Sequence, residues 1–226
     1  MKIKLRYKNY FAVLISILSF LYLLQDLSFA QDRGGYAGVF LRLGLGARAK
    51  AMGGTSAALS ADGYGVYYNP AGLAVLQKKH VMLSYRNLSL DRSFRFAGFA
   101  APMPPMAGIS FGWLNAGTDN IDGRDFSGNH TGMLTDSQNA FMFGFGLQLP
   151  ANVNIGVGGT YVHESLLDIT AKGFGINLGV LYQPFDFVSF GFAIRDLKGQ
   201  YEWNSEPLFE RGSQTNDKFP VVYTFG

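Results

Sequence analysis

The chain has 226 residues, enough for one sizeable domain or for part of a larger barrel. Aromatic residues make up 15% of it and charged residues only 15%, against roughly 25% charged residues in an average soluble domain. This composition excludes a disordered chain and is poor for a surface that faces only water. The absence of cysteine excludes disulfides, a catalytic thiol and a thiolate metal site.

Residues 1–30 have the pattern of a secretory signal peptide. Basic residues at the amino terminus precede an apolar stretch from Phe11 to Leu24, and Ser28 and Ala30 lie just before an expected cleavage site. The alternative is an uncleaved anchor, but the apolar stretch is shorter than the ~20 residues of a spanning helix. Cleavage would remove four of 19 basic residues and one of 16 acidic residues, leaving equal numbers. The basic pI is therefore no sign of nucleic-acid binding.

Residues 31–76 form a second division that is rich in glycine and other small residues and has no regular period. A third division, 77–226, alternates apolar residues with small or polar ones, which is the period of β-strands. We expect strands at 79–88, 92–101, 107–115, 139–149, 153–161, 173–182 and 188–195, and an eighth beginning at Phe219.

The two faces of the expected strands differ in kind. One face carries Phe, Leu, Ile and Val, whereas the other carries Gly, Ala, Ser and Asn with hardly any charge. A soluble sandwich would cover its second face with charged residues. The pattern favours an all-β fold, an antiparallel transmembrane β-barrel with lipid outside and a plug or cargo inside. We expect tight turns at 149–152 and 183–186, and long polar loops at 116–137 and 198–218.

The second division contains an ordered block of motifs. These are G-A-R-A-x-A-M-G-G at 46–54, A-D-G at 61–63 and Y-x-N-P-A-G-L-A at 67–74. The block resembles the PorV/PorQ family of outer-membrane proteins, which are relatives of the FadL-type fatty-acid channels. The resemblance implies a FadL-like barrel in the Gram-negative outer membrane, with the segment 31–76 as an N-terminal hatch or plug.

The family resemblance also implies about fourteen strands, whereas about eight can be counted here. Because the sequence stops within an apparent strand, we expect a truncation at the carboxy terminus and an incomplete barrel over 77–226. A closed eight-stranded barrel is the alternative, but side chains would fill its lumen and leave no room for a hatch.

Ten residues of the block stand out as a structural or gating motif of the hatch. Glycine permits tight turns, proline fixes its own φ, and Asn or Asp can bond to the backbone of a turn. The residues are Gly46, Arg48, Met52, Gly53, Gly54, Asp62, Asn69, Pro70, Ala71 and Gly72. Each one singly is best explained as folding the segment, whereas as a unit they could gate the lumen.

No arrangement of residues in the sequence has the spacing of a catalytic site, so we expect no enzyme activity, no cofactor and no metal. The glycines of 44–54 do not match the G-x-G-x-x-G pattern of a dinucleotide-binding loop. Asp119, Asp122, Asp125 and Asn129 lack the spacing of a calcium loop, which favours a solvated surface loop.

Two functions remain open, with a purely structural or adhesive surface barrel as the remaining alternative. The PorV/PorQ resemblance implies action with the type IX secretion machinery in export or surface attachment of proteins, with secretion-system proteins and exported substrates as partners. The FadL relation implies a channel for fatty acids or other hydrophobic compounds, with a hydrophobic small molecule in the lumen. Both functions place the protein in outer-membrane lipid, and neither involves nucleic acid.

Overall fold

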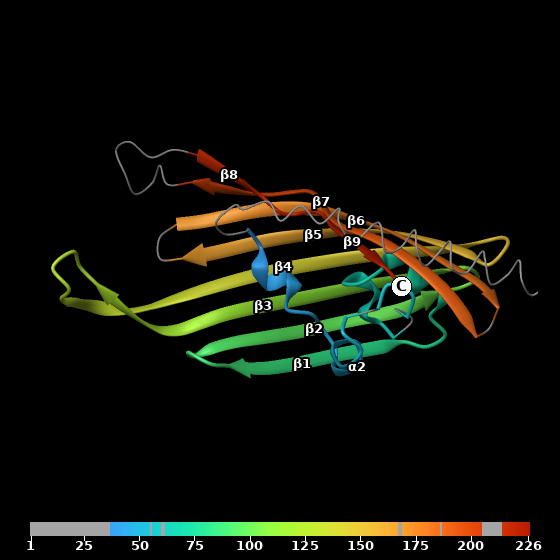
Figure 1. The fold of residues 1–226 in the computed structure, drawn as a ribbon, viewed down its shortest axis with the longest axis horizontal. Coiled ribbons are helices and arrows are strands. Elements are labelled where there is room, and N and C mark those ends of the chain that lie inside the picture. Colours follow the sequence, from blue (N-terminus) through green and yellow to red (C-terminus); the bar gives the residue numbers. More distant parts are fainter. Residues whose placement is uncertain (1–36, 55, 60–61, 167–168, 186, 205–213) are drawn as a thin grey trace, which may run out of the picture. The chain divides into compact units, whose positions relative to one another are not determined.

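The computed structural model describes residues 37–226 except 55, 60–61, 167–168, 186 and 205–213. The expected signal peptide, 1–30, lies outside the described residues. The described part consists of one antiparallel sheet and a preceding segment, 37–76, that packs against it (Figure 1). We call residues 37–76 the N-terminal segment. None of the described helices is long and apolar enough to cross a membrane.

The described residues form nine strands in an antiparallel sheet, which confirms the all-β prediction. Each strand up to β8 pairs with the next in sequence, and β9 also pairs with β7. The sheet is not closed, because in the described part of the chain β1 pairs with β2 alone. The strands are β1 (His80–Leu88), β2 (Arg92–Met103), β3 (Ala107–Arg124), β4 (His130–Leu149), β5 (Val153–Leu166), β6 (Ile169–Phe185), β7 (Val188–Asn204), β8 (Gln214–Lys218) and β9 (Val222–Phe225).

Several strands run well beyond their predicted ends, so the prediction of a long loop at 116–137 was wrong. Of the loop predicted at 198–218, residues 198–204 and 214–218 are strand, and 205–213 lie outside the described residues. Strands β3 and β4 stay paired as far as Arg124 and His130, and only residues 125–129 connect them. Residues 116–137 have the polar composition of a loop, but the hydrogen bonds between paired strands use backbone groups and tolerate polar side chains. Figure 1 shows this hairpin projecting past the other strands.

The connections also differ from the expected alternation of short and long. The turn expected at 149–152 is present as residues 150–152 between β4 and β5. Strand β6, in contrast, continues to Phe185, through most of the turn expected at 183–186. In the β3–β4 hairpin, the residues beyond the apolar part of the sheet therefore belong mainly to the strands and not to the connecting loop.

Strands β8 and β9 behave as one interrupted strand along β7. Phe219 lies between them, with a buried ring that makes an edge contact with Tyr201 at 4.8 Å between centroids. Its backbone N–H donates to the carbonyl oxygen of Gly199 (2.8 Å). The prediction that a strand begins at Phe219 was wrong, because β9 begins only at Val222, after Pro220, which has no N–H to donate to the ladder.

The sheet has two contrasting faces. The inner face is the one that contacts the N-terminal segment, and the outer face is its opposite. The burial pattern of β6 alternates regularly between the two, as the sequence period predicts. The exposed large apolar residues of the outer face, which we call the apolar belt, are Val81, Leu83, Tyr85, Phe99, Phe111, Trp113, Phe141, Phe143, Ile155, Val157, Tyr161, Phe174, Leu178, Val180, Tyr182, Phe190, Tyr223 and Phe225.

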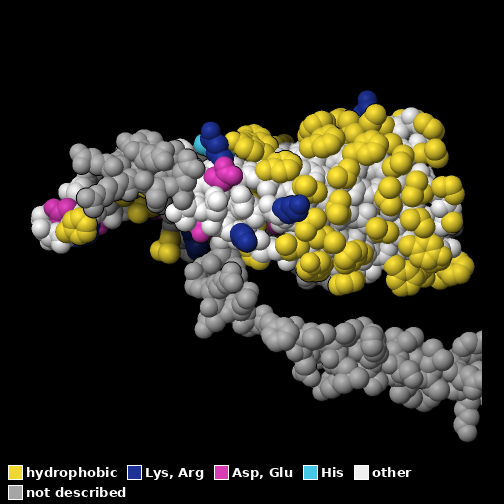
Figure 2. Space-filling view, turned by 90° about the horizontal axis from the view of Figure 1, so that it is seen from above, with side chains coloured by type: hydrophobic (Ala, Val, Ile, Leu, Met, Phe, Trp, Pro, Cys, Tyr) yellow, Lys and Arg dark blue, Asp and Glu magenta, His cyan; other side chains and the backbone are white. Residues whose placement is uncertain are grey.

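The face of the molecule seen in Figure 2 is divided along its length. In Figure 2 hydrophobic side chains crowd one end, and most acidic and basic side chains lie toward the other. An exposed apolar area of this extent is rare on a protein that meets only water.

The N-terminal segment folds as short helices and contains no strand among its described residues. Its apolar side chains, including Leu41, Leu45, Val66 and Leu73, are buried in one cluster with inner-face residues of the sheet. Its own length is too short for an independent core, so the sheet supplies the surface that buries these residues. The helices are η2 (Val39–Arg42), α2 (Ala47–Ala51), η3 (Tyr64–Val66) and η4 (Pro70–Val75), all of the 3-10 type except α2.

Candidate functional site

Four glycines from four neighbouring strands lie side by side on the inner face. Gly108 of β3 is paired with Gly146 of β4, Gly146 with Gly156 of β5, and Gly156 with Gly179 of β6. Because glycine has no side chain, these positions form a strip of bare backbone across the sheet, which we call the glycine row. A second chain can approach the sheet here at backbone distance.

Helix η4 and its capping residue lie directly on the glycine row. A Cβ atom added to any of the four glycines would come closer than 3.0 Å to this part of the N-terminal segment. The atoms met lie, in row order, in the backbone of Leu73, Ala74 and Ala71 and in the side chain of Asn69. Because backbone atoms cannot move aside as a flexible side chain can, the contact requires glycine at these positions.

Asn69 joins the start of η4 to the wall of the sheet. Its side chain is fully buried, and its Oδ1 accepts a hydrogen bond from the backbone N–H of Ala71 (3.0 Å). Its Nδ2 donates to the carbonyl oxygens of Ala57 (2.6 Å) and of Val180 in β6 (3.2 Å). Pro70 occupies the first helical position, where its missing N–H leaves no bond unmade. One side chain thus caps the helix and fixes it to the sheet.

Two tyrosines brace the chain that precedes η4. The Tyr67 hydroxyl donates to the Leu41 carbonyl oxygen (2.6 Å) and accepts from the Gly44 N–H (3.0 Å). The Tyr68 hydroxyl donates to the Leu45 carbonyl oxygen (2.7 Å) and accepts from the N–H of the same residue (2.9 Å). Burial raises the pKa of both hydroxyls, which keeps them neutral and able to donate.

Two arginines of the sheet hold backbone carbonyl groups of the N-terminal segment. Arg86 of β1 donates to the carbonyl oxygens of Leu43 and Gly44. Arg195 of β7 donates to the carbonyl oxygen of Tyr67 (3.3 Å), and its guanidinium lies 5.1 Å from the centre of the Tyr67 ring. The segment is therefore tied at both sides of the sheet as well as along the glycine row.

The space left between the segment and the sheet beside Arg195 is small. The cavity lined by Leu41, Tyr67, Asn177 and Arg195 has a volume of about 10 Å³, which is room for a single water molecule. On the sheet side, Asn177 donates to the Thr160 hydroxyl (2.9 Å) and accepts from the backbone N–H of Asp196 (3.0 Å). The packing at this contact is that of a protein interior.

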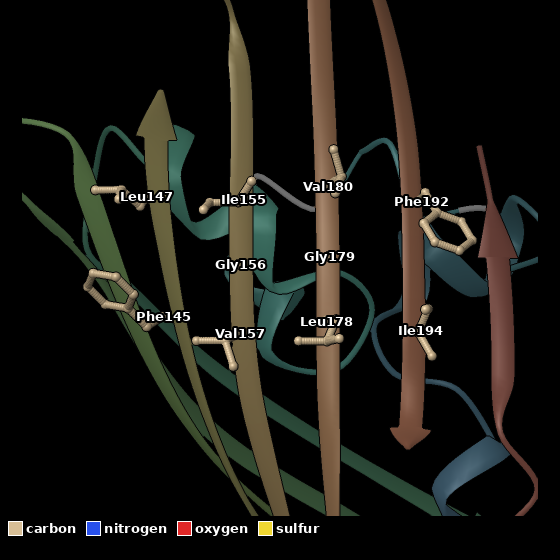
Figure 3. Close-up of a pocket in the computed structure, with 10 residues that line it drawn as sticks. All are labelled: Phe145, Leu147, Ile155, Gly156, Val157, Leu178, Gly179, Val180, Phe192 and Ile194. Atoms are coloured by element: carbon tan, nitrogen blue, oxygen red, sulfur yellow. The ribbon is translucent and has the colours of Figure 1, made fainter. Parts of the chain in front are cut away.

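At the glycine row the sheet is only one backbone thick. On the outer face a groove of about 490 Å³ crosses β4 to β7, and Gly156 and Gly179 form part of its lining. Figure 3 shows apolar side chains such as Ile155 and Leu178 along this groove, with the ribbon of the N-terminal segment passing behind the sheet. The same two glycines therefore meet the outer groove on one side and η4 on the other.

Three of the ten residues predicted from the sequence, Asn69, Pro70 and Ala71, contact the glycine row. A fourth, Gly72, follows them in η4, and all four are buried. The other six lie elsewhere in the segment. Gly46 caps α2, and Gly53 and Gly54 follow it, with φ of 71°, 71° and 81°, a positive range that favours glycine. Asp62 accepts from the N–H of Tyr64 (3.3 Å), and Arg48 and Met52 are exposed at α2.

The residues that the sheet contributes to the site were not predicted from the sequence. The glycine row and Arg195 belong to strands that are far from the motif block in sequence. The signal was present, because glycines recur at alternate positions of the expected strands. Only the register shows that four of them share one line.

Acidic residues at the tip of the β3–β4 hairpin bond to their own neighbours. Asp125 accepts from the backbone N–H groups of Ser127 and Asn129 (2.8 Å each), and Asp122 forms an ion pair with Arg124 (2.7 Å). Contacts with Asn129 hold the pKa of Asp125 below its usual value. Among the described residues no group of three or more His, Cys, Asp or Glu is placed to hold a metal ion.

No family model, no curated protein and no solved structure matches this chain. The family resemblance of the block at 46–74 therefore stays a prediction from the sequence. The two features of the described residues that bear on function are the contact between the N-terminal segment and the sheet and the apolar belt on the opposite face.

Proposed function

We propose that this chain is part of the wall of an outer-membrane β-barrel, that its N-terminal segment is a fixed hatch inside it, and that it acts with the type IX secretion machinery in export or surface attachment of proteins. The observation that carries the proposal is the glycine row, which is backed by η4 on one face and by the apolar belt on the other. The partners follow from the PorV/PorQ resemblance.

The dimensions of the apolar belt support a membrane location. In β4, β5 and β6 the apolar outer-face runs cover residues 141–149, 153–161 and 174–182. At ~3.3 Å per residue and a tilt of ~40°, each run spans roughly 23 Å, close to the ~25 Å apolar band of outer-membrane barrels. At the polar margin the Trp113 indole N–H donates to Asn139 (3.1 Å), as expected of an aromatic residue at a membrane interface.

A sheet in lipid cannot leave polar edges unpaired. The proposal therefore requires that the free edges of β1 and of the interrupted strand β8–β9 find partners in the membrane. A closed barrel provides them and gives the inner face a lumen, in which the N-terminal segment would lie.

The tight seating of the N-terminal segment supports the secretion function over the channel. Movement of a hydrophobic compound past the segment would have to break the Asn69 bonds, the arginine contacts and the packing on the glycine row. The 10 Å³ cavity beside Arg195 has no room for an acyl chain. A fixed hatch suits a barrel that works through its exposed surface and bound partners.

The test is a deletion strain complemented with the wild-type gene, in which two activities are measured in parallel. One is the display of exported proteins at the cell surface, and the other is uptake of a labelled fatty acid. We expect lost display with unchanged uptake. Normal display with lost uptake would overturn the secretion function in favour of the channel, and recovery of the protein in a soluble fraction would overturn the membrane assignment itself.

A further inference from the structure

The row of apolar side chains on the outer face of β5 is interrupted by one glycine. It runs Val153, Ile155, Val157, Gly159 and Tyr161, so that a glycine takes the place of an apolar residue. Its neighbours in register are Phe143 on β4 and Ile176 on β6, both large. The gap opens a groove of about 530 Å³ between them, lined almost wholly by apolar side chains. Its form is a slot between rows of large side chains.

A more polar groove of about 370 Å³ continues from this slot. Tyr161 and Phe174 line both, so the two share a border. Beyond that border the lining changes to Lys172 of β6 and to Lys198, Gln200 and Glu202 of β7. A ligand that fits both would have an apolar chain and a polar, charged head.

The charge of the polar groove is positive overall. Lys172 and Lys198 are exposed, and among the described residues neither forms an ion pair. His163 and Glu202 flank Lys172 in register on the neighbouring strands. Lys218 of β8 lies opposite Gln200 and adds a third lysine. Three lysines against one glutamate favour an anion.

Lys198 has a left-handed backbone conformation, which changes the direction of its side chain. It has φ of 56° in a stretch where the β6–β7 register shifts, and Asp196 nearby has φ of 59°. A left-handed conformation favours glycine, so a lysine at this position carries backbone strain. Bulges of this kind redirect a side chain. Here the redirected side chain lies at the margin of the apolar belt.

We propose that this double groove is a binding site for a phosphorylated glycolipid of the outer leaflet, of the lipid A type. One acyl chain lies in the slot over Gly159, and a phosphate group lies between Lys172 and Lys198. Apolar burial would hold the chain, and the lysines would select the phosphate. The site rests on the proposed function for its membrane setting.

The choice of leaflet follows from the ends of the strands. Lys172 and Lys198 lie on the side of the belt where β3 and β4 extend beyond the sheet. Outer-membrane barrels have short periplasmic turns and longer extracellular extensions, so this side faces the cell exterior. The outer leaflet supplies lipids with phosphate on a sugar head group.

The test measures lipid bound to the full chain by native mass spectrometry in an uncharged detergent. The probes are diphosphorylated lipid A, lipid A stripped of its phosphates, and phosphatidylglycerol. We expect lipid A to be retained best, with about fivefold weaker binding for each of Lys172→Gln and Lys198→Gly. Gly159→Val should displace the chain by filling the slot. Lys79→Gln, an exposed lysine before β1, is the matched control and should bind as the wild type does.

Two variants separate loss of binding from loss of folding. Lys198→Gly relieves the left-handed strain, so it should not lower the thermal stability. In Gly159→Val the new Cβ atom lies 3.3 Å from the Phe174 ring, which has to shift slightly, so the thermal stability of this variant is measured beside its lipid binding. Equal binding of phosphate-free lipid A or phosphatidylglycerol would overturn the proposal, as would equal weakening by Lys79→Gln. A chain that inserts into the outer membrane but shows no lipid A preference fails this inference alone. A chain that does not insert fails the proposed function.

Discussion

The side chain of Asn69 forms three hydrogen bonds, and two of them bind η4 to Ala57 and to the sheet. Replacing it with alanine removes the cap of η4 and leaves the carbonyl oxygens of Ala57 and Val180 without their donor. We expect the Asn69→Ala variant to lose about 2 kcal/mol in the free energy of unfolding, measured by urea titration in detergent. Asn87→Ala, an exposed asparagine on β1, should change this energy very little.

A second substitution at the same position separates capping from attachment to the wall. Asn69→Asp keeps an oxygen that can accept from Ala71 but loses both bonds donated by Nδ2. It also places a carboxylate beside two carbonyl oxygens, so we expect it to be at least as unstable as the alanine variant. Wild-type stability in Asn69→Asp would show that the bonds to the wall contribute nothing.

The hairpin tip offers a test of pH dependence at one carboxylate. Its bonds to Asn129 lower the pKa of Asp125 in the folded protein, so its contribution is present at neutral pH. That contribution is lost as the pH falls through the folded pKa, below the ordinary carboxyl value of about 4. We expect hydrogen-exchange protection of the Asn129 amide to drop in that range. In Asp125→Asn, which keeps an acceptor that does not titrate, protection should stay constant over the same range.

Helix η4 packs directly on the glycine row, and a substitution in the sheet can break this contact. Gly156→Ala puts a Cβ atom closer than 3.0 Å to the backbone of Ala71 and Pro70. We expect it to displace the N-terminal segment at a cost of about 1–3 kcal/mol while the strands stay paired. Limited proteolysis should then cut within 37–76 and spare the sheet.

The matched control for this contact is Gly117→Ala on β3. A Cβ atom there would meet its neighbours at 3.5 Å or more, which is ordinary contact. Equal proteolysis of both variants would mean that the segment does not depend on the glycine row. Protection of the segment in Gly156→Ala would have the same meaning.

The strands show which parts of the fold a sequence can predict. Alternation of large apolar and small residues fixes the faces, and β6 follows it along nearly its whole length. Strand ends are different, because β3 and β4 continue through residues rich in Asp, Asn and Gly that have the composition of a loop. Pairing there depends on the partner strand, and one strand's composition carries little of that information.

The candidate site was predictable on one side only. Asn69 and Pro70 form a local signal, since a capping residue before proline starts a helix whatever the surroundings. The glycine row is a product of register, which joins Gly108 to Gly179 through two intervening strands. Patterns among neighbouring residues in the sequence do not determine that alignment, so the glycine row can be recognised only once the strand register is known.

At the scale of the whole molecule, the arrangement is a thin wall with different chemistry on its two sides. Outside, the belt exposes apolar rings, among them Phe141 at 51% and Phe174 at 56%. Inside, bare backbone receives the N-terminal segment at distances that exclude side chains. A soluble protein would gain nothing from the first feature, and an open channel would be blocked by the second. Together they favour a membrane wall with a seated hatch.

The absence of cysteine makes the topology of this wall directly testable. Single cysteines are introduced at Phe126 in the hairpin tip, Ala151 in the β4–β5 turn and Val157 in the apolar belt, all exposed positions. A membrane-impermeant maleimide added to intact cells should label Phe126→Cys and leave the other two unlabelled. After the outer membrane is permeabilised, Ala151→Cys should react as well, whereas Val157→Cys should stay protected by lipid. Rapid labelling of Val157→Cys in native membranes would show that the belt meets water, and labelling of Ala151→Cys on intact cells would reverse the orientation on which the lipid site depends.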